Sequence, residues 1–234
     1  MVRITWLGHS SFQLALASGE TYLLDPWIDG NPKYPAGHVI ARVDAVLVSH
    51  GHFDHIQAAE SLAKEHNAPV VSIYEICQYL KARGVTSIAP MNKGGSQMVG
   101  PLKVTMTHAL HSSCIEDAEG TIVYAGDPAG FVLHFPDGRR AYFAGDTAVF
   151  GDMALIAELY SPELCFLPIG DLFTMGPQEA AHAVKLLRYP KAVIPMHWGT
   201  FPPLTGRPGD LAARIAGSGS TRVWSLEPGV TVDW

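Results

Sequence analysis

Cysteine is scarce in this chain of 234 residues, which has only three. An odd, small number of cysteines argues against a disulfide framework and fits free thiols in a reducing cytoplasm. No apolar run approaches the ~20 residues that a membrane helix needs. Residues 1–6 also lack the charged-then-apolar layout of a signal peptide. We therefore expect a cytoplasmic protein with no membrane partner.

Positive charge is also in short supply, with 16 Lys and Arg against 22 Asp and Glu and a formal net charge of −6. Nucleic acids and anionic membranes are bound through clustered Lys and Arg, so neither is expected as a partner. No repeat, low-complexity tract or linker divides the sequence, and its hydrophobic fraction of 47% is typical of a packed fold. The expected organisation is a single domain over residues 1–234.

Short apolar segments separated by turn-forming residues predict many strands. Strands are expected at residues 2–7, 12–17, 21–24, 45–49, 70–73, 102–107, 121–125, 131–135, 140–144, 164–167, 192–195, 222–225 and 230–232. Helices are expected at about 57–66, 74–83, 152–160, 177–187 and 209–216. Strands followed by mixed helices and strands, twice over, predict two sheets packed face to face with helices outside, a four-layer αββα sandwich of the α/β (α+β) class. Its site would lie where strand ends of both sheets converge.

Histidine is plentiful, and the most informative of the 11 histidines lie between residues 50 and 55. An apolar strand runs into His50 and His52, which are two residues apart and can point the same way. Asp54 and His55 follow at the turn into the next helix. Three imidazoles and one carboxylate within six residues indicate a cation site. This donor set suits zinc, with manganese, iron or nickel as alternatives.

Further donors lie at the ends of other predicted strands, namely His111, Asp146 and His197. Each is a weak signal alone, but their shared position at strand ends makes the set strong. Together with residues 50–55 they provide five imidazoles and two carboxylates, enough for two metal ions with an open position each. His108 competes with His111, which the neighbouring pair Ser112 and Ser113 favours.

The motif His50-Gly51-His52-Phe53-Asp54-His55, followed by His111, Asp146 and His197, resembles the metallo-β-lactamase superfamily. Residues 6–10, 24–26 and 144–147 resemble its branch with ascorbate-6-phosphate lactonase. Residues 111–113, 127–131, 167–171 and 195–197 resemble a family of small metal-dependent hydrolases. The resemblance covers essentially the whole chain and implies the αββα fold and two divalent metal ions. It implies that His50, His52 and His111 hold one ion, that Asp54, His55 and His197 hold the other, and that Asp146 bridges them.

Several residues near these motifs have two readings. Asp25 could accept a hydrogen bond from a ligand histidine and orient it, or be a turn residue before Pro26. His9 could face the site as a catalytic donor to substrate, or be a structural loop histidine. Asp127, where the similar family often has Asn, could contact the metals, although an Asp-Pro turn is favoured. Asp171 could support a ligand residue, or be an acidic turn residue. The remaining histidines are expected on the surface or in the core: His38, His66, His134 and His182.

The function that this pattern predicts is metal-assisted hydrolysis of a small molecule. Two cations would share a water, lower its pKa and place hydroxide against an ester, lactone or phosphodiester. Asp54 could also accept a hydrogen bond from that hydroxide and fix its direction. Two divalent ions against Asp54, Asp146 and hydroxide leave a charge of about +1, which favours an anionic substrate.

Two alternatives to a hydrolase remain. A flavodiiron-like redox protein would usually carry Glu in place of His52 and append a flavin domain. A non-catalytic metal-binding protein would tend to lose ligands, whereas the set here is full. The sequence leaves the substrate, the native metal and the formation of a homo-oligomer open.

Overall fold

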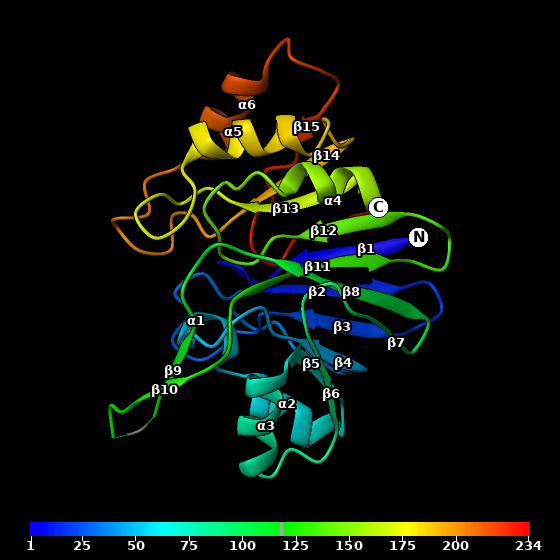
Figure 1. The fold of residues 1–234 in the computed structure, drawn as a ribbon, viewed down its shortest axis with the longest axis vertical. Coiled ribbons are helices and arrows are strands. Elements are labelled where there is room, and N and C mark those ends of the chain that lie inside the picture. The colour runs from blue at the N-terminus through cyan, green and yellow to red at the C-terminus, as the bar shows by residue number, and fades with distance from the viewer. Residues whose placement is uncertain (118) are drawn as a thin grey trace. The chain divides into compact units, whose positions relative to one another are not determined.

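The computed structural model describes residues 1–117 and 119–234. It divides into two compact units, each built on its own seven-stranded sheet (Figure 1). The first unit comprises Met1–Asn92, Ser112–Pro128 and Glu227–Trp234, and the second comprises Lys93–His111 and Ala129–Leu226. The chain is thus a mixed α/β protein with two large sheets. Its organisation as a single domain stays a prediction.

The first unit is built on a sheet with the strand order β16-β1-β2-β3-β4-β5-β6. Its strands are β1 (Val2–Trp6), β2 (Phe12–Leu16), β3 (Thr21–Leu24), β4 (Ala45–Leu47), β5 (Val70–Ile73), β6 (Ile88–Met91) and β16 (Thr231–Asp233). Strands β3 to β6 pair in parallel, and β3, β4 and β5 are buried throughout, as expected for parallel strands covered on both faces. Parallel pairing brings the carboxyl ends of these strands to one edge, from which the 50–55 segment departs.

Three helices and a separate hairpin complete the first unit. The helices are α1 (Phe53–Ile56), α2 (Ala59–His66) and α3 (Tyr74–Ala82), and the hairpin pairs β9 (Cys114–Glu116) with β10 (Ile122–Tyr124). Helix α2 ends at Asn67, whose left-handed conformation (φ 50°) suits an amide side chain. The helix expected at about 57–66 is thus confirmed as α2, and the short α1, which was not expected, precedes it and carries Asp54 and His55.

The second unit has the strand order β15-β14-β13-β12-β11-β8-β7. Its strands are β7 (Ser96–Val99), β8 (Leu102–His108), β11 (Ala129–His134), β12 (Arg140–Phe143), β13 (Leu164–Pro168), β14 (Ala192–Met196) and β15 (Arg222–Val223). Its helices are α4 (Met153–Tyr160), α5 (Pro177–Leu186) and α6 (Pro208–Ile215). Proline at the first position of α5 and α6 is compatible with a helix start, where its missing N–H is not needed. The apolar faces of these helices share one buried cluster with β12, β13 and β14.

Most expected strands and helices are confirmed, but three strands were not predicted: β6, β7 and β9. β6 contains Pro90, and both β6 and β7 are edge strands, so their exposed, broken patterns do not read as buried strands. β9 pairs only with β10 and belongs to neither large sheet. Within the described ranges, no helix is long and apolar enough to cross a bilayer.

Candidate metal centre

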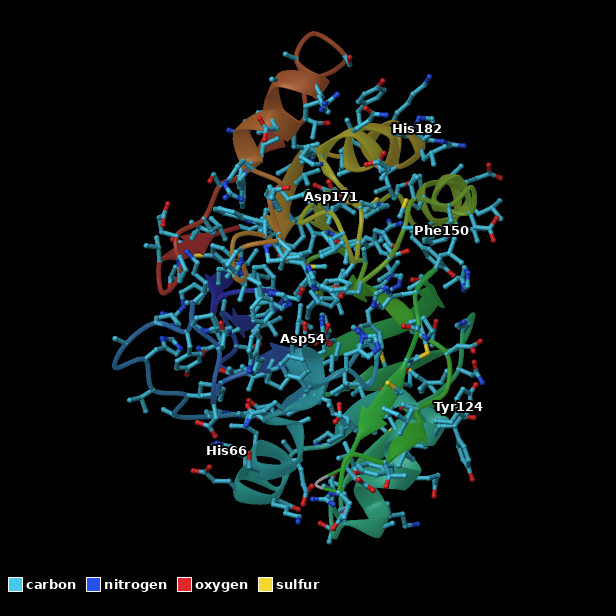
Figure 2. All side chains as sticks on the ribbon, turned by 90° about the vertical axis from the view of Figure 1, so that its left-hand side faces the viewer. Asp54, His66, Tyr124, Phe150, Asp171 and His182 are labelled. Carbon is cyan, nitrogen blue, oxygen red and sulfur yellow. The ribbon has the colours of Figure 1, made fainter. Side chains whose placement is uncertain are left out.

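The 50–55 segment gathers its donors within the first unit as the sequence predicts. His52 is the N-cap of α1, and Asp54 and His55 lie in that helix, with Asp54 labelled in Figure 2. His50 and His55 are fully buried, whereas His52 and Asp54 are half-buried. The Nε2 atom of His50 lies 3.0 Å from Nδ1 of His52. Two ring nitrogens converging at this distance are suited to share one cation.

A second group of donors forms around Asp54 in the same unit. Its Oδ2 atom lies 2.9 Å from Nε2 of His9 and 3.8 Å from Nε2 of His55. The ligand atoms of these three residues all lie within 4.8 Å of one another. The backbone oxygen of His9 accepts a hydrogen bond from Trp6 Nε1 (2.9 Å), and the ring of His9 makes a T-shaped contact with Trp27 (centroids 5.2 Å apart). A nitrogen and oxygen donor set of this kind fits a borderline divalent metal.

Asp25 lies next to His50 of the first group and His55 of the second, and its side chain is completely buried. Its Oδ1 accepts the Ser49 N–H (2.7 Å), and its Oδ2 accepts the Ser49 hydroxyl (2.6 Å) and His55 Nδ1–H (2.7 Å). Burial raises the pKa of the Asp25 carboxyl, and its contacts with His55 and Ser49 oppose the rise. The backbone of Asp25 is left-handed (φ 43°), a conformation that Asp tolerates better than most residues. Asp25 therefore fixes the ring of His55 with Nε2 facing Asp54.

The same carboxylate also sets the tautomer of His50. The Ser49 hydroxyl gives its only proton to Asp25, so its oxygen must accept from Nδ1 of His50, 3.0 Å away. With Nδ1 protonated, neutral His50 presents the lone pair of Nε2 toward His52. Both buried histidines of the motif are thus prepared to bind a cation through Nε2.

The β9–β10 hairpin holds the backbone of the motif. The Gly51 N–H donates to Ser113 Oγ at 3.2 Å. A Cβ on Gly51 would lie 2.6 Å from the Cβ of Ala125 and 2.9 Å from the carbonyl oxygen of Cys114, so a side chain does not fit. Ser112 Oγ lies 3.4 Å from His52 Nε2. The sequence pattern drew attention to Ser112 and Ser113 but did not predict that they contact the 50–55 segment, which lies about 60 residues earlier in the chain.

The second unit brings together the other three predicted ligands. His197 Nε2 lies 3.0 Å from Asp146 Oδ2, and His111 Nε2 lies 3.7 Å from the same oxygen. His197 follows β14 in a left-handed conformation (φ 55°). A Cβ on Gly170 would lie 1.9 Å from the His197 carbonyl oxygen, so only glycine permits this approach. These donors are therefore grouped within their own unit.

His108 takes a different place in the second unit. Its ring packs edge-on against Phe150, labelled in Figure 2, and its Nδ1 lies 3.2 Å from Nζ of Lys93. The strand ends at His108, and Leu110 N–H then donates to Thr147 Oγ1 (2.9 Å), next to Asp146 in the chain. This contact brings the following residue, His111, to Asp146.

The other acidic residues and histidines that the sequence singled out make ordinary structural contacts. Asp171 is exposed, and its Oδ1 accepts the Leu172 N–H at 2.8 Å, which is a turn contact. Asp127 is exposed and accepts the Tyr124 hydroxyl at 3.4 Å. The remaining histidines are spread over the two units: His38 beside Gln13, His134 beside Thr105, His66 at the end of α2, and His182 exposed on α5 (Figure 2).

Comparison with known proteins identifies the family. The model of the β-lactamase superfamily domain matches residues 20–198. A UPF0173 metal-dependent hydrolase of Solibacter usitatus is 61% identical over 233 residues, covering 100% of both chains. One from Koribacter versatilis is 49% identical over 211 residues, covering 90% of each chain. The solved structure of Igni18, a metallo hydrolase of the archaeon Ignicoccus hospitalis, has 34% identity and a TM-score of 0.85, covering 100% of this chain and 99% of its own. The chain therefore belongs to the UPF0173 family of metal-dependent hydrolases, in the metallo-β-lactamase superfamily.

Proposed function

We propose that this chain hydrolyses a small anionic ester, lactone or phosphodiester with the help of two divalent cations, most simply zinc. The proposed ligands are His50, His52, Asp54, His55, His111, Asp146 and His197. The observation that supports this best is the buried carboxylate of Asp25, which orients His50 through Ser49 and His55 directly. A buried carboxylate that controls the tautomers of two histidines is the usual support of a metal site.

Bound divalent ions supply an activated water at neutral pH and polarise the oxygen of the bond to be cleaved. The chain's own residues then have separable tasks. Asp54 carries an oxygen that can accept a proton or a hydrogen bond from the attacking water. His9, whose Nε2 lies 2.9 Å from Oδ2 of Asp54, holds that carboxylate in place. Because His9 is fully buried, we propose that it acts mainly through Asp54.

The preference for an anionic substrate follows from charge at the ligands. Two divalent cations outweigh the carboxylates of Asp54 and Asp146, so the centre stays positive although the whole chain carries −6. Distant surface charge is screened over ~8–10 Å in physiological salt, whereas charge at a partly dehydrated site is screened much less. An anionic group on the substrate is therefore attracted to the centre.

The proposal is tested by turnover of matched substrate pairs with the metal-loaded protein. Each pair contains an anionic compound and a neutral isostere, such as a phosphodiester and its methyl triester, or a carboxylated lactone and its amide. We expect higher kcat/KM for the anionic member, with a difference that shrinks as salt is added. No turnover of any ester, lactone or phosphodiester by fully loaded protein would contradict the proposed reaction, and a neutral preference at every ionic strength would contradict the charge argument alone.

A further inference from the structure

A pocket of about 430 Å³ lies along helices α5 and α6 of the second unit. Its volume is in the range of small-molecule sites. No proposed metal ligand lines it. It is therefore a second candidate binding site, separate in its residues from the proposed metal centre.

Three basic side chains line this pocket. His182 and Lys185 are three residues apart on α5 and share one face of that helix, and Arg214 comes from the last turn of α6 (Figure 2 labels His182). Within residues 1–117 and 119–234, none of the three side chains forms a hydrogen bond or ion pair. Some other exposed cations of the chain pair with carboxylates, among them Arg42 with Asp44, Arg83 with Glu60, Arg188 with Glu158 and Lys191 with Glu163, whereas Lys81 and Lys103 are likewise without such a pair among the described residues.

The one acidic residue of the lining is already engaged. Glu179 Oε2 accepts the Gly176 N–H at 3.2 Å, the capping contact that closes the first turn of α5. Its charge is thus directed to the helix N-terminus, where it is stabilising. Lys185 and Arg214 together exceed it by one positive charge, in a chain whose total is −6.

The rest of the lining consists of the polar residues Gln178 and Ser218 and of an apolar wall formed by Val149, Ala181, Ile215 and Tyr189. Tyr189 follows α5 in a left-handed conformation (φ 55°), directly after Arg188 with φ 58°. Two consecutive left-handed residues other than glycine are uncommon and persist only where their surroundings hold them. A Cβ on Gly219 would lie 3.1 Å from the Tyr189 ring, so the glycine leaves room for the ring in this place.

We propose that this pocket binds a small phosphate monoester with a planar apolar group. Arg214 offers a fork of N–H donors that matches phosphate oxygens, and Lys185 offers a compact charge in the same pocket. The planar group would lie against Tyr189 and the aliphatic wall. The pocket is a binding site, and no bond is broken there.

The test is a titration of the metal-loaded protein with phenylphosphonate, a phosphate monoester mimic that cannot be hydrolysed, followed by the backbone amide signals in NMR. We expect saturable shifts in residues 178–189 and 214–218. Arg214→Ala and Lys185→Ala should each raise the Kd for these shifts roughly tenfold, because each removes a charged hydrogen-bond donor. Benzyl alcohol, which has the ring without the charge, should leave the same amides unshifted at equal concentration.

Arg188→Ala is the matched control. Arg188 is an exposed arginine that follows the same helix, but its side chain pairs with Glu158 and does not line the pocket. It should leave the Kd unchanged within twofold. The proposal is overturned if phenylphosphonate shifts only amides next to the metal ligands, or if Arg188→Ala weakens binding as much as Arg214→Ala. An equal Kd for inorganic phosphate and phenylphosphonate would contradict the proposal that the apolar wall binds the planar group of the ligand.

Discussion

Asp25→Asn is the substitution that separates the orienting role of Asp25 from simple space filling. Asparagine keeps the volume of the side chain but replaces one acceptor oxygen with an NH₂ donor. Asp25 uses both oxygens, Oδ1 for the Ser49 N–H and Oδ2 for the Ser49 hydroxyl and His55 Nδ1–H. If the amide oxygen stays on the Ser49 N–H, the NH₂ group faces His55. His55 must then accept at Nδ1 and carry its proton on Nε2, where it can no longer bind a cation.

The expected loss follows from this change of tautomer. Removal of a partner that orients a metal ligand typically costs 10–100-fold in metal affinity, which corresponds to about 1.4–2.7 kcal/mol. Asp25→Asn should lie at the upper end, because the same carboxylate also orients His50 through Ser49. Ser49→Ala breaks only the link to His50 and leaves the contact between His55 and Asp25, so its loss should be smaller.

The assay is competition for Zn²⁺ between the protein and a coloured chelator at neutral pH. Asp44→Asn is the matched control, because Asp44 also accepts a backbone N–H, from Thr21 at 2.8 Å, but belongs to no donor group of the proposed centre. Zinc affinity should be unchanged in the control. Far-UV circular dichroism of the zinc-free proteins shows whether each variant is folded. Wild-type zinc affinity in folded Asp25→Asn would refute the orienting role.

The remaining predictions concern the ligands, the motif backbone, acid stability and salt. His52→Ala should lose bound metal and activity together while His66→Ala stays near wild type, as metal analysis and turnover will show; equal damage would mean that His52 is not a ligand. Gly51→Ala should lower the thermal midpoint by about 3 °C or more, because its Cβ overlaps Ala125 at a cost of ~1–3 kcal/mol; an unchanged midpoint would contradict the clash. Burial alone would raise the pKa of Glu60, but its contacts with lysine and arginine lower it below its usual value, so its stabilisation is present at neutral pH and lost as the pH falls through the folded pKa. Glu60→Gln should therefore reduce the free energy of unfolding at pH 7, by under about 1 kcal/mol, and this difference should shrink as the pH is lowered below the usual pKa of glutamate, as denaturant titrations will check. Added salt should reduce the kcat/KM ratio of an anionic substrate over its neutral isostere, and a constant ratio would argue against attraction at the centre.

The sequence predicts the local part of this site well. Residues 50–55 combine an apolar strand with donors spaced two residues apart, and both features are contained in a few consecutive residues. Asp146 and His197 are recognisable for the same reason, since each lies within three residues of the end of a largely apolar strand. A donor residue shortly after an apolar strand can therefore be recognised without knowing any long-range contact.

Tertiary contacts account for what the sequence does not reveal. Ser113 accepts the Gly51 N–H across 62 residues of chain, and the hairpin that directly follows Ser113 belongs to neither large sheet. Whether Asp25 is a turn residue or a partner of His55 likewise depends on a contact over 30 residues. The edge strands β6 and β7 are missed because β6 contains Pro90 and β7 is largely exposed, so neither shows a clear apolar pattern.

The central claim is that seven side chains hold two divalent cations. X-ray diffraction from crystals of the zinc-loaded protein, with data collected on both sides of the zinc absorption edge, tests it most directly. We expect two anomalous peaks ~3.5–4 Å apart, one beside His50, His52 and His111, the other beside Asp54, His55 and His197, with Asp146 between them. A single peak, or peaks coordinated by other residues, would contradict it.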